Sequence, residues 1–460
     1  MVSGALNAVD NLTDLFWAGF LGSRAIASVG VGQTWIQLFN TGRMGLDIGG
    51  RAMVSRAVGS GDLPLANHIA RQSLIFNMAL NVVVMILGIL ASDFLLRVLG
   101  VSEGVAEEGT TYQRCRFVSS FFFGLTMVTG SLLQAGGDTL TPMKAQMVSR
   151  VIHIALSPVL IFGWLGVPVL GVTGAAIANA ISQAIGGALN LRALLNGSSR
   201  ISITLDHFRF DGLALWQQIR IGAPASVTSA ERSLAQVILV GLAAPFGATG
   251  LAVYSILQRV EMFGGFGAQG LAQAAGIIVG QSLGAKRPER AKTTVWWTLG
   301  STGLIQILVC GSMFVFAEQV MLLFSRDPDV IEIGVPWMHI AVVGFVLFSS
   351  TNVLVQVLNT AGDTMIPMVA GLGALWGIQQ PVAIVLTGAA QTVSILSFNA
   401  VVPSDWNLGI IGIAWGILVA AIVRFAGLFL YFLWGPWWKR EVLVGQSWDM
   451  VIEPEPVSRP

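Results

Sequence analysis

The sequence is poor in charge. Of its 460 residues, 25 are Lys or Arg and 24 are Asp or Glu, so that only 11% carry a charge, against about 25% in a typical soluble domain. This scarcity excludes an ordinary soluble enzyme. The net charge is only +1, and the sequence has no polybasic run. It therefore lacks the extended positive surface that binds nucleic acid. We expect no nucleic-acid partner.

Cysteine is also scarce. Cys115 and Cys310 lie in separate apolar stretches, without the CxxC spacing of a zinc or redox site. The histidines are scattered and include no His-Glu-x-x-His pattern, which a metal-dependent membrane enzyme would show. A membrane-embedded enzyme would need a close set of nucleophile, base or metal ligands, so we expect neither enzymatic activity nor a cofactor.

Long apolar runs are what the chain has in abundance, since 54% of its residues are hydrophobic. A membrane barrel would show segments of about ten residues with alternating polarity. Backbone groups in lipid need internal partners, so uninterrupted runs should form helices, and about 20 residues span a bilayer. We predict twelve membrane helices, at residues 1–21, 28–58, 68–98, 110–135, 141–165, 171–195, 213–245, 249–283, 289–324, 331–360, 366–389 and 409–434.

An internal repeat divides these helices into two sets of six. Residues 136–143, Gly-Gly-Asp-Thr-Leu-Thr-Pro-Met, return 225 residues later at 361–368 as Ala-Gly-Asp-Thr-Met-Ile-Pro-Met. Because six is an even number, the two halves should have the same orientation in the membrane. Repeated halves with a substrate path between them are typical of secondary transporters. The repeat therefore predicts an all-α membrane protein of two six-helix lobes, with an extra stretch at about 390–408.

The repeat also sets the expected boundaries: an N-terminal lobe at 1–198, a linker at 199–212, a C-terminal lobe at 213–436 and a tail at 437–460. The counterpart of the Gly-Ala-Pro at 222–224 would fall before residue 1, so we expect a truncated first helix. Most Lys and Arg residues lie in loops that follow even-numbered helices. The positive-inside rule then predicts cytoplasmic termini for a multi-pass protein of the plasma (inner) membrane.

Three motifs occur in the order of a known family. Residues 14–22 read Asp-Leu-Phe-Trp-Ala-Gly-Phe-Leu-Gly, residues 258–261 read Gln-Arg-Val-Glu, and residues 279–284 read Val-Gly-Gln-Ser-Leu-Gly. Together with the two Gly-Asp-Thr-x-x-Pro-Met turns, they resemble the multidrug and toxic compound extrusion (MATE) family from about residue 9 to 434. The resemblance implies alternating access and export of amphipathic, cationic drugs or metabolites in exchange for inward H⁺ or Na⁺. A monomer is expected, because one chain holds both lobes.

The resemblance also implies a cation-coupling site. Asp14 occupies the position of the family's first-helix aspartate, and a carboxylate at membrane depth is a functional candidate, although it could also lie near a helix end. The family's polar positions in helices 5 and 6 fall at His153, Ser157 and Asn179, where all three residues differ from the usual pattern. Without a fifth-helix carboxylate no metal site is firm, although Na⁺ at Asp14 stays possible. Histidine titrates near neutrality, which favours H⁺ coupling with His153 as relay or, alternatively, a structural His153.

Four weaker candidates carry charges inside the predicted helices. Glu231 corresponds, one residue early, to a helix-7 glutamate of many relatives, and Arg232 follows it. Adjacent helical residues do not face each other, so we expect each to find a different partner. Arg259 and Glu261 both fit the family pattern, with a role in lobe packing or in cargo binding. Asp10 is the remaining acidic candidate.

The charged residues inside the predicted helices also help to judge a rival function. A flippase for lipid-linked sugars shares the general architecture but needs a cationic cavity for its diphosphate. Here the embedded charges have both signs, which favours a cationic cargo. Arg43 and Asp47 are spaced i, i+4 and are predicted to form a structural ion pair, whereas Arg424 should snorkel or cap carbonyl groups.

Overall fold

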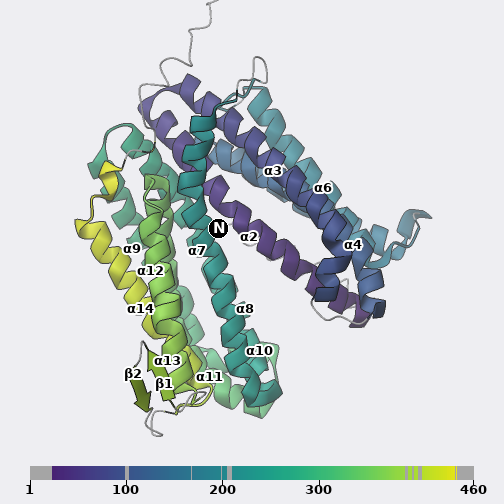
Figure 1. Ribbon diagram of the computed structural model, residues 1–460, viewed down its shortest axis with the longest axis vertical. Coiled ribbons are helices and arrows are strands. Elements are labelled where there is room, and N and C mark those ends of the chain that lie inside the picture. The colour runs from purple at the N-terminus through teal and green to yellow at the C-terminus, as the bar shows by residue number, and fades with distance from the viewer. Residues whose placement is uncertain are drawn as a thin grey trace, which may run out of the picture.

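The protein is built almost entirely of helices (Figure 1). The computed structural model describes residues 23–98, 103–166, 168–197, 199–204, 210–388, 392–395, 398–401, 407–440 and 442. Among these residues, nine stretches are long and apolar enough to cross a membrane. Helix α2 is not one of them and carries five charged residues, Arg24, Arg43, Asp47, Arg51 and Arg56.

The first half of the chain forms one group of packed helices, called here the N-terminal group. Helix α6 packs against α4 and α5, while α3 packs against α4 and α2. Asp138 Oδ1 accepts hydrogen bonds from the backbone N–H groups of Leu140 and Thr141, so this carboxylate caps α5. The group comprises α2 (Ser23–Ser60), α3 (Leu63–Val98), α4 (Glu103–Ala135), α5 (Leu140–Phe162), a 3₁₀ turn (Trp164–Gly166) and α6 (Gly171–Leu195).

The second half forms the C-terminal group, in which α11 packs against α8, α9 and α14. Asp211 Oδ1 caps its first helix by accepting from Leu213 N and Ala214 N. Its elements are α7 (Gly212–Ala243), a 3₁₀ turn (Ala244–Phe246), α8 (Gly247–Gly284), α9 (Pro288–Val315), α10 (Ala317–Phe324), α11 (Pro328–Ala361), α12 (Met365–Ala374), a π-turn (Leu375–Gln379), α13 (Gln380–Leu386), β1 (Thr392–Ile395), β2 (Phe398–Val401), α14 (Ile411–Trp434) and a 3₁₀ turn (Trp437–Lys439).

Two predicted helices are interrupted. The run at 289–324 predicts one helix, but the structure breaks it at Phe316 into α9 and α10. The run at 366–389 contains a five-residue π-turn just before Pro381. Proline has no backbone N–H, so Pro381 cannot donate a hydrogen bond within the helix. The wider π-turn accommodates this missing bond.

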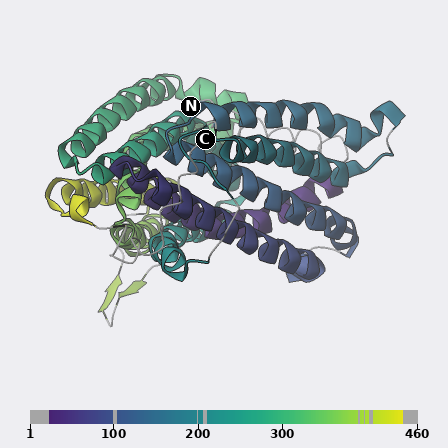
Figure 2. The same ribbon diagram turned by 90° about the horizontal axis from the view of Figure 1, so that it is seen from above.

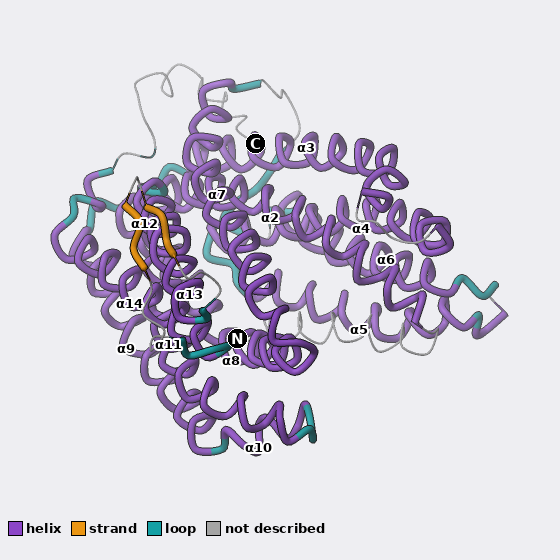
Figure 3. The backbone as a smooth tube through the Cα atoms, turned by 60° about the horizontal axis from the view of Figure 1, so that its bottom comes forward, coloured by secondary structure: helices purple, strands orange, loops and turns teal. Residues whose placement is uncertain are grey.

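The inserted stretch at 390–408 lies outside the predicted helices, and its described residues include two short strands. Strands β1 and β2 pair there as an antiparallel hairpin, with Thr392 opposite Val401. The hairpin lies beside α13 and α14 (Figure 3) and extends away from the helices (Figure 2). Its β-branched and aromatic residues favour strands, and a stretch outside the apolar core can pair its backbone in this way.

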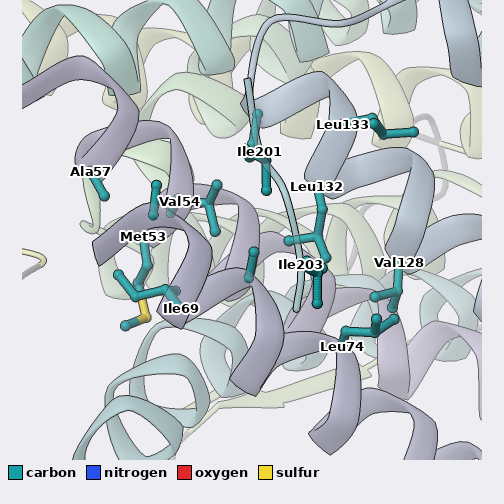
Figure 4. Close-up of a cluster of buried hydrophobic side chains, with 14 of the residues drawn as sticks. Met53, Val54, Ala57, Ile69, Leu74, Val128, Leu132, Leu133, Ile201 and Ile203 are labelled. Atoms are coloured by element: carbon teal, nitrogen blue, oxygen red, sulfur yellow. The ribbon is translucent and has the colours of Figure 1, made fainter. Parts of the chain in front are cut away.

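The segment that links the two groups contributes to a buried core. Ile201 and Ile203 are 0% and 1% exposed, and Figure 4 shows them among side chains of α2, α3 and α4. Ile203 N donates to Leu194 O over 2.9 Å. The expected linker at 199–212 is therefore packed against the N-terminal group at Ile201 and Ile203, which bury apolar surface there.

The two groups meet through the C-terminal half of α2. A Cβ atom added to Gly45 would lie 2.2 Å from the carbonyl oxygen of Gly222 in α7, so glycine is required for this close approach. Nearby, Arg51 Nη2 donates a hydrogen bond of 2.9 Å to Gln356 Oε1 of α11. The contact thus combines backbone packing with a polar bond between the groups.

These contacts continue to the end of α2 that is followed by the loop to α3. There Arg56 Nη2 donates to Ala361 O over 2.9 Å. Toward the other end of α2, Trp35 Nε1 instead donates to Leu95 O of its own group. Figure 1 shows the N-terminal end of α2, in dark purple, well away from α8. The groups therefore meet at one end and diverge toward the other.

Candidate functional site

The three candidates of α5 and α6 for the coupling site are buried. His153 and Ser157 are 0% exposed and Asn179 is 5% exposed. Ser157 Oγ donates to the carbonyl oxygen of His153 over 2.7 Å, and Ser119 Oγ donates to Asn179 Oδ1 over 2.5 Å. Helices α5 and α6 are held together nearby, since Ser149 Oγ donates to the carbonyl oxygen of Ser182.

The bonding pattern tells which groups are free to bind an ion. Ser157 bonds to the carbonyl of its own helix, as Ser often does inside membrane helices, and its oxygen keeps lone pairs. Asn179 uses its carbonyl oxygen for Ser119, a residue that the sequence patterns did not single out. Asp14 and Asp10, the acidic candidates of this half, lie outside the described residues.

A second candidate site is a cavity of about 120 Å³ inside the C-terminal group. Residues of α7, α8, α11, the π-turn and α14 line it. Four aromatic side chains and several polar or charged ones face it, namely Tyr254, Trp337, Phe345 and Phe348, with Arg232, Gln236, Gln258, Glu261, Gln379 and Arg424. Aromatic walls with a few polar groups are typical of small-molecule sites.

An ion pair and an aromatic ring meet at this cavity. Arg232 Nη2 of α7 lies 3.0 Å from Glu261 Oε1 of α8, and the Arg232 guanidinium lies 4.2 Å from the ring centroid of Phe348 in α11. The side chains of Arg232 and Glu261 are 43% and 26% exposed. A carboxylate and a ring face therefore already hold one cation at the cavity.

Glu231, the neighbour of Arg232, points elsewhere. Its side chain is 2% exposed, and its Oε1 lies 4.0 Å from Arg424 Nη2. Glu231 and Arg232 thus have different partners, because adjacent residues on a helix point about 100° apart. The prediction that Arg424 snorkels or caps carbonyl groups is wrong, since a carboxylate from α7 lies within reach.

Of the two candidates in α8, Arg259 is exposed and Glu261 pairs with Arg232. The predicted ion pair between Arg43 and Asp47 is wrong. Arg43 donates to Asn81 Oδ1 and, over 3.2 Å, to Asn40 Oδ1 and forms no ion pair with Asp47. Side chains from other helices compete for these groups, and sequence spacing carries no information about them.

The cavity was missed at the sequence level, although a signal for it exists. Trp337, Ala341, Phe345 and Phe348 recur in α11 at spacings of three and four, which place them on one helix face. A helix that only packs in the core of a membrane protein would show the same pattern, so the pattern does not by itself identify a cavity. Among the described residues, no group of three or more His, Cys, Asp or Glu could hold a metal ion.

Comparison with known proteins supports the resemblance. The family model MatE matches residues 1–159 and 224–385. The "Probable multidrug resistance protein YoeA" of Bacillus subtilis is 28% identical over 397 residues, 84% of each chain. The "Probable multidrug resistance protein NorM" of Thermotoga maritima is 24% identical over 448 residues, covering 96% of this chain and 92% of its own.

The fold agrees with a solved transporter structure. The "Outward-facing conformation of a multidrug resistance MATE family transporter of the MOP superfamily" superposes with a TM-score of 0.83 and 24% identity, over 95% of this chain and 92% of that one. The residues matched by the family model make up more than half of the sequence. The chain therefore belongs to the MatE family, whose members are multi-pass membrane transporters of small molecules and not enzymes.

Proposed function

We propose that this protein is a secondary active antiporter that exports amphipathic, cationic drugs or metabolites in exchange for inward H⁺. One observation carries the proposal. The cavity of the C-terminal group already binds a guanidinium between the Glu261 carboxylate and the Phe348 ring. A cationic, flat cargo that displaced Arg232 would gain the same two interactions, while the remaining rings would cover its apolar surface.

The rival function is a flippase for lipid-linked sugars. Its diphosphate cargo needs cationic groups that are free to bind phosphate oxygens. Both arginines of the cavity instead face carboxylates, Arg232 at 3.0 Å from Glu261 and Arg424 at 4.0 Å from Glu231. The cavity is therefore close to neutral, which favours an amphipathic cation over a diphosphate.

In this proposal two six-helix lobes, 1–198 and 213–436, alternate between two states around the linker 199–212, with the tail 437–460 beyond them. The twelve helices span the plasma membrane with both termini in the cytoplasm. The contacts of Arg56 lie at the end that the distribution of Lys and Arg assigns to the cytoplasm. The described conformation would then be closed toward the cytoplasm and open to the other side. One chain supplies both lobes, so the transporter acts as a monomer without a cofactor.

The coupling ion is proposed to bind in the N-terminal half, at Asp14 together with the cluster of His153, Ser157 and Asn179. Na⁺ prefers several hard oxygen ligands. The cluster offers a hydroxyl and an amide oxygen that already accepts from Ser119, and an imidazole. A single carboxylate suffices to carry a proton, and burial and rehydration make it take up and release that proton. These residues therefore favour H⁺ over Na⁺.

The experiment uses purified protein in proteoliposomes loaded with a cationic dye. We expect efflux with a pH gradient alone, little efflux with a Na⁺ gradient alone, and no ion-driven efflux by Asp14→Asn. Efflux driven only by Na⁺, or an active Asp14→Asn protein, would contradict the coupling proposal. No efflux of a broad panel of cations, with accumulation of a lipid-linked sugar in a deletion strain, would favour the flippase.

The role of the cavity is tested separately. Phe348→Ala and Glu261→Gln should each weaken dye binding by about tenfold, the loss of about 1 to 2 kcal/mol expected for one cation–π or charged contact. Val343→Ala serves as control, because Val343 lies on the same helix and is 50% exposed. Equal binding by all three variants would place the cargo elsewhere.

A further inference from the structure

Asp47 is an acidic residue with a buried carboxylate, to which neither the family comparison nor the proposed cargo site assigns a role. It lies in α2, four residues after Arg43 and four before Arg51, so that the three side chains follow one helix face. Both carboxylate oxygens are shielded from solvent and have no hydrogen-bond partner among the described residues. An ionised carboxylate without partners in such a place is strongly disfavoured.

The two arginines beside Asp47 are engaged elsewhere. Arg43 donates to Asn81 and Asn40 of its own group, and also to the carbonyl oxygen of Ser120 over 3.4 Å. Arg51 donates to Gln356 Oε1 of the C-terminal group over 2.9 Å. Neither guanidinium forms an ion pair with Asp47, although both act on it electrostatically.

The other elements that pack against α2 present uncharged groups in this region. They are Ser73 and Asn81 of α3, Ser120 of α4, Gln218 of α7, Gly280 of α8 and Gln356 of α11. In the part of the chain that the structure describes, the charges that act on Asp47 are those of Arg43 and Arg51. Of these two, Arg51 is the one whose partner belongs to the opposite helix group.

We propose that Asp47 is a second proton-binding site, which is protonated while Arg51 is bonded to Gln356 and gives up its proton when the two helix groups separate there. Separation breaks the Arg51–Gln356 bond, and the freed guanidinium pairs with the carboxylate of Asp47 at the i, i+4 spacing. The O–H bond of the carboxyl group breaks and the proton passes to water that enters from the opened end. No other atom or electron is transferred.

This inference rests on the proposed alternating access and adds a proton-release step to it. Opening of the contact end and release of a proton become one event, because a single guanidinium cannot serve Gln356 and Asp47 together. By reciprocity, loading Asp47 with a proton stabilises the conformation in which the groups touch. A membrane-embedded carboxylate is an appropriate carrier for such a proton.

The first test is an infrared titration of the purified full-length protein in detergent, which follows the carbonyl band of protonated carboxyl groups. Asp47→Asn should remove one titrating group. Asp93→Asn is the matched control, since Asp93 is exposed and pairs with Arg97 over 2.9 Å, and it should leave that group in place. Identical titrations of the wild type and Asp47→Asn would overturn the proposal.

The second test addresses the switch without changing Asp47. Gln356→Ala frees Arg51 and should move the titration midpoint of that group to lower pH by about 1 to 3 units, the effect of an adjacent guanidinium. Gln281→Ala removes another bond between the groups, from Gln281 Nε2 to Ala135 O at 2.9 Å, and should leave the midpoint unchanged. Equal shifts in both variants, or none in Gln356→Ala, would reject the switch. Both titrations need no transport, so failure of the antiport assay is a separate outcome.

Discussion

At the residue scale, the three positions that depart from the family pattern implied by the resemblance are all buried. His153, where the resemblance implies an asparagine, is fully buried beside Ser157, whose hydroxyl bonds to the His153 carbonyl oxygen. Imidazole can exchange a proton near neutral pH, whereas an amide cannot. The side chain at position 153 is thus suited to modulate the proposed proton site without being the site.

We therefore expect His153→Asn to retain dye efflux but to change its pH profile, or to increase its dependence on Na⁺. The amide supplies an oxygen ligand and removes the titrating ring. Efflux rates across a series of pH values, with and without Na⁺, measure the effect, and Ser119→Ala controls for loss of a neighbouring hydrogen bond. An unchanged pH profile would leave His153 with a purely structural role.

At the scale of single elements, the crossing of α2 and α7 depends on small residues. A Cβ atom at Gly45 would lie 2.2 Å from both Gly222 O and Ser226 Oγ, while a Cβ atom at Gly42 would have no neighbour within 4 Å. Two glycines in the same helix, three residues apart, therefore face different surroundings.

Gly45→Ala should lower the free energy of unfolding by about 1 to 3 kcal/mol, the usual cost of overpacking, and should reduce efflux because the groups can no longer close. Gly42→Ala should leave both properties nearly unchanged. Thermal unfolding in detergent and dye efflux measure the two effects. Equal behaviour of the two variants would mean that the helices repack at no cost.

The repeated Gly-Asp-Thr-x-x-Pro turn has a different role in each half of the chain. Asp138 caps α5 through backbone N–H groups. Its counterpart Asp363 instead accepts hydrogen bonds from Tyr431 Oη and, over 3.4 Å, from Arg440 Nε. The Asp363 carboxylate raises the pKa of the Arg440 guanidinium and so fixes the segment that follows α14.

Asp363→Asn should loosen this segment, because the amide keeps the shape of the side chain but loses its charge. Trypsin should then cleave after Arg440 several-fold faster than in the wild type. Asp138→Asn is the matched control at the equivalent position of the repeat and should leave the cleavage rate unchanged. Unaltered cleavage in Asp363→Asn would show that other contacts, such as the buried Trp437, hold the segment.

At the scale of the whole molecule, the two helix groups touch at one end and diverge at the other (Figure 1). A Cβ atom at Gly280 of α8 would lie 3.0 Å from the Cβ atom of Ser55 in α2, slightly closer than in a disulfide. Within the N-terminal group, a Cβ atom at Gly50 would lie 3.3 Å from that of Ser73. The Ser55–Gly280 pair joins the two groups, whereas the Gly50–Ser73 pair lies within one of them.

Oxidation of a Ser55→Cys/Gly280→Cys protein should abolish dye efflux, and a reducing agent should restore it, because the bond locks the groups together. Gly50→Cys/Ser73→Cys should remain active when oxidised. The proportion of cross-linked protein and the efflux rate are measured on the same sample. Full efflux by a completely cross-linked Ser55–Gly280 pair would contradict alternating access at this interface.

The sequence by itself determined the helical character of the chain, its repeat and its family. Apolar runs such as 335–357 must form helices, because lipid offers backbone groups no partners, and this constraint acts locally. The repeated turn at 136–143 and 361–368 is likewise visible in the order of residues. Caps such as Asp138 at α5 follow from the same short-range rules.

Only the tertiary structure decided which charged groups meet. Arg232 pairs with Glu261, Glu231 lies near Arg424, and Arg51 bonds to Gln356, 305 residues away. Short-range spacing predicted a different pair, Arg43 with Asp47, because it cannot weigh partners from distant helices. Inside a membrane protein an unpaired charge is costly, so these charged groups take the partners that packing brings closest, and packing depends on the whole chain.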